Sequence, residues 1–429
     1  MKVLLLGSGG RESALGWALA RSPAVEELIS APGNPGLAEI GMLADEPGSP
    51  EAAVSLARHI AADLVVIGPE APLVAGFGDA LREDGFAVFG PDAAAARIEG
   101  SKAFAKELMQ RAGVPTAAAR AFKEPEGAFA YLDEMGPPYV VKADGLAAGK
   151  GVVVTEDRIE ARAAVEDRLV RGSFGDAGRV VVVEEFLDGE EVSLIAFTDG
   201  SEVVPCEPAQ DYKRVADGDR GPNTGGMGSY SPVPSCPPPL AERIAHEVIE
   251  PMVRATRAAG GPFVGAIYAG LALTSRGPRV IEFNCRFGDP ETQALLPRLD
   301  ADLAEVCAAA ATRELEGVKL SWTSDVCVSV VLASAGYPGT YSTGIPIDGV
   351  EAAAGVEGVT IFHAGTARRD DGALVTAGGR VLAVSARGAT FAEARSRAYE
   401  AAGSIEFEGK HVRSDIARRA EDAERGATP

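Results

Sequence analysis

Histidine is scarce in this chain of 429 residues, which has only His59, His246, His363 and His411. None of them lies in a sequence pattern typical of a Ser/His/Asp or Cys/His catalytic group. We therefore expect the chemistry to depend on positioning and electrostatics and not on a covalent intermediate with a side chain.

Cysteine is also sparse, and the five cysteines form no CxxC pair. An odd number without paired spacing argues against a disulfide framework or a zinc site and favours a reducing compartment. Long apolar runs are missing as well. The run Val3–Leu6 is too short for a signal peptide, and no other run reaches membrane-spanning length. We therefore expect a cytoplasmic protein that does not bind membranes.

Basic residues are fewer than acidic ones. The chain has 41 Lys and Arg against 62 Asp and Glu, a formal net charge of -21. This sign argues against general binding of nucleic acids or anionic membranes, which need a basic face. An acidic protein that handles a phosphate ligand must gather its cations locally. Cations do fall within the motifs described below, at Lys102, Lys142, Lys150, Lys213 and Arg286.

The chain is long enough for two to four substructures with a large core, and 46% of its residues are hydrophobic. Its first hundred residues alternate strand and helix patterns, which predicts an open parallel α/β sheet with ligands beyond the carboxyl ends of the strands. The expected strands are Val3–Leu6, Leu28–Ser30, Leu64–Ile67 and Phe86–Phe89, and the expected helices are Arg11–Arg21, Glu51–Ala61 and Leu73–Glu83.

The segment Gly7–Glu12 follows the first of these strands. A dinucleotide fingerprint would need glycine where Glu12 stands and an acidic residue at the end of the second strand, where Ser30-Ala31-Pro32 lie. Both conditions fail, so an NAD enzyme is a poor explanation. A smaller anion, such as a sugar phosphate, fits the loop amides and the helix N-terminus better, and a tight turn without ligand is the alternative.

The segment Val280–Thr292 says most about function. Glu282 and Asn284 are two residues apart on an expected strand and therefore point to one face. A carboxylate and an amide oxygen are ligands that Mg2+ takes, with nucleotide phosphates completing its shell. Arg286, next on that face, would hold a planar cation close to the same phosphates. A strand edge with a surface ion pair is the alternative.

Two β-type runs, Tyr139–Lys142 and Val152–Val154, are joined by a segment rich in glycine. A Walker A loop needs Gly-Lys-Ser/Thr before a helix, whereas here Gly-Lys precedes glycine and a valine strand. The pattern predicts a hairpin whose backbone can close over phosphates, although an ordinary flexible hairpin is common. The segment contributes Lys142, Gly145, Gly149, Lys150 and Gly151.

A third motif lies at Val180–Ser193, where a buried strand ends in Glu-Glu-Phe-Leu before Glu190 and Glu191. The backbone of such a hinge can bind an adenine edge, and a following carboxylate can accept hydrogen bonds from ribose. A charged turn would look much the same.

The stretch Asp211–Pro239 has little periodicity and is rich in Gly, Pro, Asp and Ser. An irregular stretch of this length is usually functional or mobile, and we expect a substrate-facing loop. Packing is favoured over a disordered linker by Met227 and Tyr230. After Trp322 the chain turns strand-rich again and ends in a helix from about Phe391 to Ala402, which predicts a small α+β cap that buries the site and carries little chemistry.

The chain carries, in this order, a lysine helix, a lysine hairpin, a Glu-Glu-Phe-Leu hinge and a Glu-x-Asn-x-Arg strand. This order of segments resembles the ATP-grasp superfamily. Further motifs resemble one of its families, phosphoribosylamine–glycine ligase, also called glycinamide ribonucleotide synthetase. The resemblance covers almost the whole chain. It is carried by Met1–Glu12, Gly68–Val74, Gly100–Ala105, Lys142–Val152, Gln210–Arg214 and Gly221–Pro232.

The resemblance implies a multidomain α/β and α+β protein. An N-terminal open parallel α/β (pre-ATP-grasp) domain would span 1–100 and an ATP-grasp domain 101–315, with the glycine-rich hairpin lid at about 115–190. A small C-terminal α+β domain would span 320–429.

The implied reaction joins glycine to 5-phosphoribosylamine in purine (IMP) biosynthesis, with ATP and Mg2+ or Mn2+ as cofactors. It gives glycinamide ribonucleotide, ADP and phosphate through glycyl phosphate, and we expect a monomer with small-molecule partners alone. Another ATP-grasp carboxylate–amine ligase or an ATP-dependent carboxylase is the main alternative, but should lack Gly7–Glu12 together with Gly221–Pro232. A non-catalytic nucleotide-binding protein would have lost Arg286 or Glu282, and both are present.

The resemblance also assigns roles to residues. Binding of ATP falls to Lys102, Lys142, Gly149, Lys150, Gly151, the adenine hinge Glu184, Glu185, Phe186 and Leu187, and the ribose contact Glu191. The metal ligands are Glu282 and Asn284. Catalysis is assigned to Arg286, Lys213 and Asn223. The substrates would contact Gly9, Gly10, Arg11, Glu12, Asn34, Gly68, Pro69, Glu70, Asp211 and Thr224.

Three features depart from the pattern of this family. Ser13 and Tyr212 stand where histidine is more usual, which affects fine substrate contacts and not the phosphate or metal residues. Many ATP-grasp enzymes also carry a metal carboxylate on the strand before Glu-x-Asn, whereas Gly265–Leu271 offers none. The ligation of a second metal ion therefore stays open.

Overall fold

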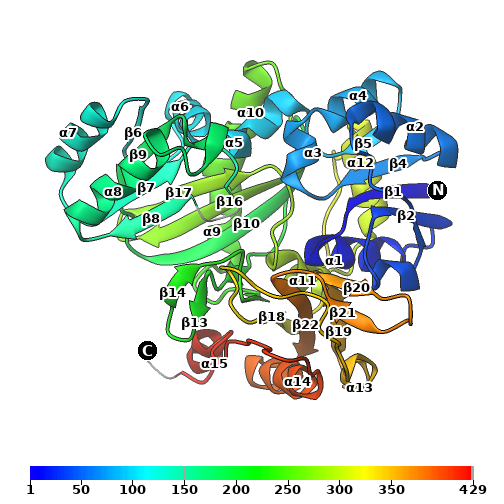
Figure 1. Cartoon of the computed structure of the whole chain (residues 1–429). Coiled ribbons are helices and arrows are strands. Elements are labelled where there is room, and N and C mark those ends of the chain that lie inside the picture. The colour runs from blue at the N-terminus through cyan, green and yellow to red at the C-terminus, as the bar shows by residue number, and fades with distance from the viewer. Residues whose placement is uncertain (148–150, 427–429) are drawn as a thin grey trace.

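The computed structural model describes residues 1–147 and 151–426. Its N-terminal part is a five-stranded parallel sheet in the order β3-β2-β1-β4-β5, at the blue end of the ribbon in Figure 1. The strands are β1 (Lys2–Gly7), β2 (Glu27–Pro32), β3 (Met42–Leu43), β4 (Leu64–Ile67) and β5 (Ala87–Phe89). Each expected strand is present, because runs such as Val3–Leu6 and Leu64–Ile67 bury completely in the sheet.

Helices connect these strands, and one more follows the last strand. They are α1 (Gly10–Leu19), α2 (Pro50–Ile60), α3 (Glu70–Val74), α4 (Phe77–Glu83) and α5 (Ala93–Gly100). The prediction of one helix over Leu73–Glu83 is wrong. The chain forms two short helices there, because Gly76 between them has φ +84°, a left-handed conformation that ends one helix and starts the next.

The helix α6 (Lys102–Ala112) leads into a four-stranded antiparallel sheet, β6-β9-β7-β8, packed with two helices (Figure 1). Ser101 caps α6 by accepting the N–H of Phe104, as expected from its sequence. In the sheet, Lys142 pairs with Val152, so the predicted hairpin is formed. The elements are β6 (Ala119–Phe122), α7 (Pro125–Met135), β7 (Tyr139–Ala143), β8 (Val152–Thr155), α8 (Arg158–Leu169) and β9 (Val181–Glu185).

A second antiparallel sheet, β11-β10-β16-β17, lies at the centre of the molecule (Figure 1). It consists of β10 (Glu190–Asp199), β11 (Val203–Pro205), β16 (Val264–Thr274) and β17 (Gly277–Asn284). The helices α9 (Pro238–Ile244) and α10 (Glu250–Ala258) pack nearby, and α12 (Leu303–Thr312) packs against both β10 and the N-terminal strand β5. The central sheet is therefore held directly against the N-terminal part.

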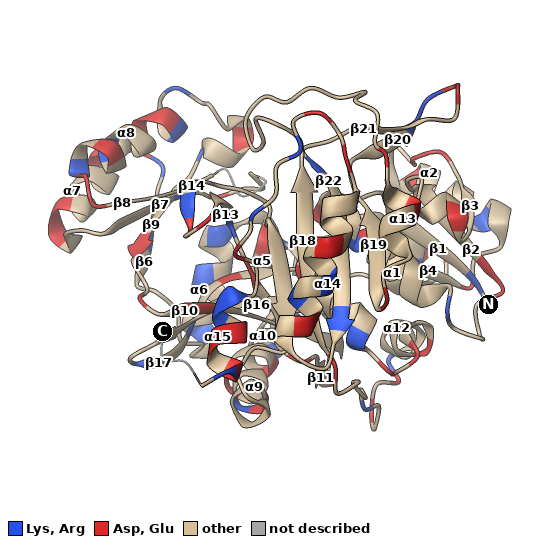
Figure 2. Ribbon diagram, turned by 90° about the horizontal axis from the view of Figure 1, so that it is seen from below, with Lys and Arg blue, Asp and Glu red and all other residues tan. Residues whose placement is uncertain are grey.

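The last sheet has the order β12-β15-β18-β22-β19 and is covered by α14 (Phe391–Ser404), as Figure 2 shows from below. Its strands are β12 (Gln210–Asp211), β15 (Gly228–Ser231), β18 (Val326–Ala333), β19 (Val359–His363) and β22 (Arg380–Gly388). On α14 and on α15 (Arg418–Glu424), acidic and basic residues are interspersed, as Figure 2 shows.

The stretch Asp211–Pro239 is not one irregular loop, as we expected. It contains the end of β12, the hairpin of β13 (Arg214–Ala216) and β14 (Arg220–Asn223), the strand β15 and the first residues of α9. Short strands of two to four residues carry too weak a local pattern to be seen in the sequence. The expectation that Met227 and Tyr230 pack is confirmed, since both are fully buried.

All five cysteines are buried and unpaired. Within the residues that the structure describes, no helix is long and apolar enough to cross a membrane.

Candidate active site

Glu282 and Asn284 end β17, where they pair with Gly270 and Tyr268 of β16. Their spacing places both side chains on one face of the strand, as predicted. Burial acts to raise the pKa of Glu282, yet nearby cations lower it overall, so this carboxylate is ionised. The cations are Lys213, Lys142, Lys102 and Arg286. The fold thus collects around one carboxylate the cations that the sequence scatters over nearly two hundred positions.

A buried acid with two lysines lies beside this carboxylate. Glu184 pairs with Lys142 and lies 2.6 Å from Lys106, and all three side chains are almost inaccessible to solvent. Lys142 also donates to the carbonyl of Ile281 on β17 at 3.3 Å. Burial raises the pKa of Glu184, but the two lysines outweigh it and lower the pKa. The side chain of Glu184 therefore orients Lys142, while its backbone lies at the start of the predicted hinge.

Lys102 reaches the hairpin from the first turn of α6. Its Nζ donates to the carbonyl of Gly145 at 3.1 Å, and burial lowers its pKa while Glu282 opposes that change. A lysine held between the hairpin and Glu282 is placed to meet the phosphates of a bound nucleotide. Gly149 and Lys150, predicted for the same role, lie outside the described residues.

Gly151 lies where the hairpin returns. A side chain added there would come within 2.7 Å of the Cβ of Ala147, so only glycine fits between the arms of the hairpin.

The predicted adenine hinge follows the end of β9. Glu185 lies 2.5 Å from Arg276, whereas Phe186 is 43% exposed and Leu187 is half-buried. An exposed phenylalanine beside free backbone can cover a planar base. Glu191, at the start of β10, lies 2.7 Å from the ammonium group of Lys213. The structure thus pairs a predicted ribose contact with a predicted catalytic lysine.

Lys213 lies next to a group of buried acids and hydroxyls. Burial lowers its pKa, but Glu191 and Asp211 raise it well above its ordinary value. Burial and neighbouring carboxylates raise the pKa of Asp211 to about 8, with Lys213 opposing. Glu291 is one of those carboxylates. This group is rich in negative charge, which suits an ammonium or a metal ion more than a further anion.

Beneath it, Tyr268 and Ser193 hydrogen-bond one another at 2.8 Å. Their hydroxyl oxygens lie 3.1 Å (Ser193) and 2.9 Å (Tyr268) from Oε1 of Glu291, which accepts from the hydroxyl whose proton is not used between the two. The strand before Glu-x-Asn, β16, thus carries the phenol of Tyr268 and no carboxylate.

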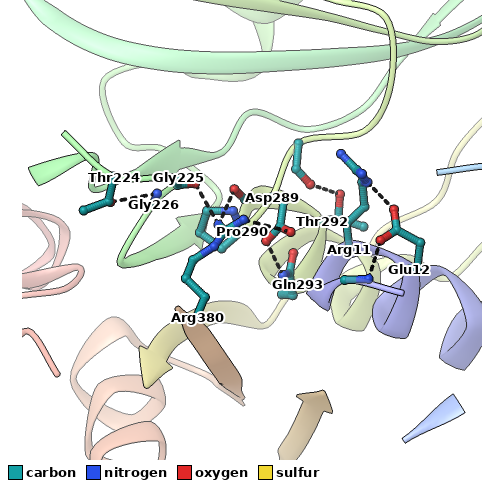
Figure 3. A network of polar contacts seen from close by, with 12 residues as sticks. Arg11, Glu12, Thr224, Gly225, Gly226, Asp289, Pro290, Thr292, Gln293 and Arg380 are labelled. Atoms are coloured by element: carbon teal, nitrogen blue, oxygen red, sulfur yellow. Dashed lines mark hydrogen bonds and ion pairs between the residues drawn. The ribbon is translucent and has the colours of Figure 1, made fainter. Parts of the chain in front are cut away.

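The loop after β14 is fixed by a residue of the C-terminal sheet (Figure 3). Arg380 donates to the carbonyls of Gly225 and Asp289 at 2.7 and 2.8 Å, and lies 3.1 Å from the Asp289 carboxylate. Thr224 accepts the N–H of Gly226 and donates to the carbonyl of Lys213. Thr224 is therefore a turn former that holds Lys213. Asn223, predicted to be catalytic, is the residue before it and ends β14.

Alternating charges connect the N-terminal loop with the end of β17. The N–H of Gly9 donates to Glu12 at 2.7 Å, and the other oxygen of Glu12 lies 2.5 Å from Arg11 (Figure 3). Arg11 lies 3.8 Å from Glu70, which in turn lies 3.1 Å from Arg286. Burial raises the pKa of Glu70, but Arg286 and Arg11 lower it to about 2. The residues predicted for the sugar phosphate thus contact a residue predicted for the ATP chemistry.

This arrangement qualifies the expected role of the loop amides. A Cβ added to Gly68 would lie 2.2 Å from Glu12, so Glu12 fills the space between the loop and the turn that Gly68 and Pro69 form. The N–H of Gly9 is bonded to Glu12. A phosphate would have to use the other amides or displace this carboxylate. Gly10 is enclosed in the same way, because a Cβ there would lie 2.6 Å from Gln293.

Asn34 uses its whole side chain within the protein. Its amide donates to the carbonyls of Ser8 and His363 at 2.9 and 3.0 Å, and its oxygen accepts from the N–H groups of Gly36 and Leu37. It is 5% exposed. This geometry favours a structural role for Asn34, which holds the loop, rather than direct contact with a substrate.

The two unusual residues also contact the protein itself. Ser13 donates to Asn34 at 3.3 Å, and Tyr212 is buried beneath the guanidinium group of Arg413, 4.7 Å from its ring.

Three domain profiles match the chain, and each is described as phosphoribosylglycinamide synthetase. The N domain matches residues 1–99, the ATP-grasp (A) domain residues 100–292 and the C domain residues 327–419. The chain belongs to the phosphoribosylglycinamide synthetase family.

Individual relatives agree. A phosphoribosylamine–glycine ligase of Rhizobium meliloti is 52% identical, over 98% of this chain and 99% of the relative. One of Streptomyces coelicolor is 53% identical, over 99% of this chain and 100% of the relative. The crystal structure of phosphoribosylamine–glycine ligase from Thermotoga maritima, 34% identical, superposes with a TM-score of 0.83 and covers 97% of this chain and 100% of its own. The predicted resemblance and fold class are thereby confirmed.

Three contributors were missed by sequence reasoning. Lys106 follows Lys102 by four residues on one face of α6, so its spacing was a usable signal. Glu99 lies in the last turn of α5 and binds Arg286, and Arg380 reaches the loop from β22. Neither Glu99 nor Arg380 has a local pattern that distinguishes it from an ordinary surface charge.

Proposed function

We propose that this chain joins glycine to 5-phosphoribosylamine, using ATP, to give glycinamide ribonucleotide, ADP and phosphate in purine biosynthesis. One observation carries the proposal. An ionised Glu282, with Asn284 beside it, faces Lys102, Lys142, Lys213 and Arg286 in a chain that its ligase relatives match from end to end. No other arrangement of titratable groups in the described residues combines a phosphate-binding set with a substrate loop in this way.

The ATP-grasp fold implies the use of ATP and a divalent metal ion. The described residues contain no group of three or more His, Cys, Asp or Glu that could hold a metal ion by themselves. This fits an ion that takes two protein oxygens and completes its shell with phosphates and water. We infer that Glu282 and Asn284 supply those oxygens, and that the ion is Mg2+ or Mn2+. Such an ion would neutralise charge on the ATP phosphates.

The first step forms glycyl phosphate. A carboxylate oxygen of glycine attacks the γ-phosphorus, the bond to the bridging oxygen breaks, and ADP leaves. Lys102 and Lys142 would bind the phosphates, with Gly149, Lys150 and Gly151 on the hairpin. Arg286 would balance the charge that develops on the transferred phosphoryl group. A lost donor of this kind costs about 3–4 kcal/mol in other enzymes.

The adenine would lie at the hinge formed by Glu184, Glu185, Phe186 and Leu187. Glu191 would contact the ribose, and its partner Lys213 would remain beside the acyl phosphate.

The second step forms the amide. The amine nitrogen of phosphoribosylamine attacks the acyl carbon, the carbon–oxygen bond to phosphate breaks, and phosphate leaves with the proton lost by nitrogen. Arg11, Glu12 and Glu70 would place the amine, because their ion pairs lead directly to Arg286. The acidic surroundings of Asp211 suit the ammonium group of glycine. Thr224 and Asn34 would hold the surrounding loops.

We also propose the predicted division at 1–100, 101–315 and 320–429, with strands β12 and β15 of the second part completing the sheet of the third. The sheet β6-β9-β7-β8 with its two helices would be the lid. We further infer a monomer in a reducing cytoplasm, which suits five buried free thiols.

The test is ADP release by the purified chain with glycine and phosphoribosylamine, supplied separately and together, against a panel of other carboxylates and amines. Release that needs both substrates, with glycinamide ribonucleotide found by mass spectrometry, supports the proposal. Equal release with another carboxylate–amine pair, or with bicarbonate, would assign the chain to a different ligase or carboxylase reaction.

A further inference from the structure

Glu99 lies at the point where the N-terminal part meets the central sheet. It lies in the last turn of α5, two residues before the cap of α6, and is 9% exposed. One carboxylate oxygen accepts the N–H of Cys285 at 2.7 Å, and the other lies 2.8 Å from Nη2 of Arg286. A single buried side chain therefore binds both the backbone and the side chain of the segment that follows Asn284.

Every nitrogen of the Arg286 guanidinium group has a partner. Nη2 donates to Glu99, Nε donates to Glu70 at 3.1 Å, and Nη1 donates to the carbonyl of Phe287 at 3.1 Å. Three acceptors around a planar guanidinium group fix its orientation. Burial lowers the pKa of Arg286, but Glu99 and Glu70 raise it above its ordinary value, so the cation is permanent.

Stability alone is a weak reason for this pair. A buried ion pair recovers little more than the free energy lost on removing both ions from water, and apolar replacements are often as stable. Orientation is the better explanation. Glu99 lies three residues before Lys102, the lysine of α6 that we propose binds phosphate. Its contacts therefore connect the start of α6 to the end of β17, the strand that carries Glu282.

We propose that Glu99 is a positioning residue for the ligase reaction: it holds Arg286 and the end of β17 in register with Lys102. This rests on the proposed function, because Arg286 is taken to stabilise charge on the transferred phosphoryl group. Glu99 itself touches no reacting atom. The effect of its charge passes through Arg286, whereas the hydrogen bond from the Cys285 N–H needs only an acceptor, and this separates the proposal from a general role in folding.

The experiment is a double-mutant cycle with Glu99→Gln and Arg286→Ala, measured on the full reaction. Glutamine keeps the shape of the side chain and an acceptor for the Cys285 N–H but removes the charge. We expect Glu99→Gln to lower kcat by about 100-fold, the size of effect that small misplacements produce, with KM for ATP changed by less than about threefold. In the Arg286→Ala background, Glu99→Gln should change kcat by less than about twofold, because the group it positions is gone.

Glu83→Gln is the matched control, since Glu83 is an exposed glutamate in the last turn of α4. It should leave kcat unchanged. Equal losses from Glu99→Gln in both backgrounds, or a loss in melting temperature without a loss in kcat, would overturn the proposal. If Glu99→Gln does not fold, the same cycle with Glu99→Asp, which keeps the charge but shortens the side chain, decides in the same way. A parent enzyme that releases no ADP with both substrates would instead refute the proposed function.

Discussion

Arg286 and Glu70 lie 3.1 Å apart, although one follows β17 and the other begins α3 in the N-terminal part. The sequence suggests that they belong to two different sites, one for ATP chemistry and one for phosphoribosylamine. The structure joins those sites through an ion pair. A reaction in which an amine attacks an acyl phosphate needs this proximity, because the two reacting groups must meet within about 3–3.5 Å.

Glu70 is the residue whose loss should separate the two half-sites. In Glu70→Gln, Arg286 keeps Glu99, but Arg11 loses its link to Arg286. We expect kcat/KM for phosphoribosylamine to fall by about 10- to 100-fold, within the range that one charge-assisted contact supplies, while the affinity for ATP stays within about twofold. Steady-state kinetics and calorimetry with ATP measure the two effects. A larger loss for ATP than for phosphoribosylamine would place Glu70 in the nucleotide site.

Glu282→Ala removes the carboxylate that the surrounding cations face. We expect turnover to fall by at least about 1000-fold, because the variant loses both the proposed metal ligand and the counter-charge for the lysines. The fold should survive, since Glu282 is not in the hydrophobic core. The checks are turnover as a function of Mg2+ concentration and the circular dichroism spectrum. Unchanged turnover at low Mg2+ would exclude Glu282 as a ligand.

Lys142→Ala should affect both ATP and stability. Glu184 is buried, and its partners are Lys142 and Lys106. In the variant, Lys106 is the one lysine that still pairs with this buried carboxylate. Loss of a partner from a buried ion pair costs about 3–5 kcal/mol, and the second lysine should reduce this to roughly 2 kcal/mol. Calorimetry should show weaker ATP binding with glycine binding retained, and urea unfolding should show the lower stability. Adding Glu184→Gln should lower the stability further, because it leaves Lys106 without its buried carboxylate partner, and should not restore ATP binding.

The sequence was sufficient where a motif is contiguous. Glu282 and Asn284 share a face because strand geometry is local, and the cap at Ser101 depends on three neighbouring residues. The parallel sheet could be predicted because β1, β4 and β5 carry apolar runs between helix patterns, whereas the two-residue edge strand β3 was not predicted. Gly76 shows the limit, since glycine is tolerated within many helices and only its φ of +84° reveals the break.

Contacts between distant segments could not be predicted. Arg380 meets Gly225 across 155 positions, and Arg286 meets Glu99 across 187. Their partners depend on how the sheets pack, which periodicity does not encode. The loop Gly7–Glu12 shows the same limit, because the amides look open to an anion in the sequence and Glu12 binds one of them in the fold.

We expect the buried His363 to make the stability of the fold depend on pH. It is 5% exposed, hydrogen-bonded to Thr366, and burial together with Arg368 lowers its pKa to about 4. The unfolded chain takes up the proton near pH 6.5, so the folded state loses stability as the pH falls from about 6.5 to 4, by roughly 3 kcal/mol. Urea unfolding at several pH values gives the free energy of unfolding as a function of pH. In His363→Asn this free energy should rise less steeply with pH, by the slope that corresponds to about one bound proton. An identical slope in both proteins would show that His363 is protonated in the fold.

The last prediction concerns Gly68, whose packing holds Glu12 against the loop. A Cβ at Gly68 would lie 2.2 Å from a carboxylate oxygen of Glu12, so Gly68→Ala must move that side chain. Glu12 would then lose the N–H of Gly9 and its contact with Arg11, and the predicted phosphoribosylamine pocket would change shape. We expect amide formation to fall by about 10-fold or more, the stability by roughly 1–3 kcal/mol, and ATP binding by less than about twofold. Gly48→Ala is the control, because a Cβ there meets nothing within 4 Å. If ATP binding is lost and phosphoribosylamine binding is kept, the nucleotide lies at the N-terminal loop and the assignment of the two sites is reversed.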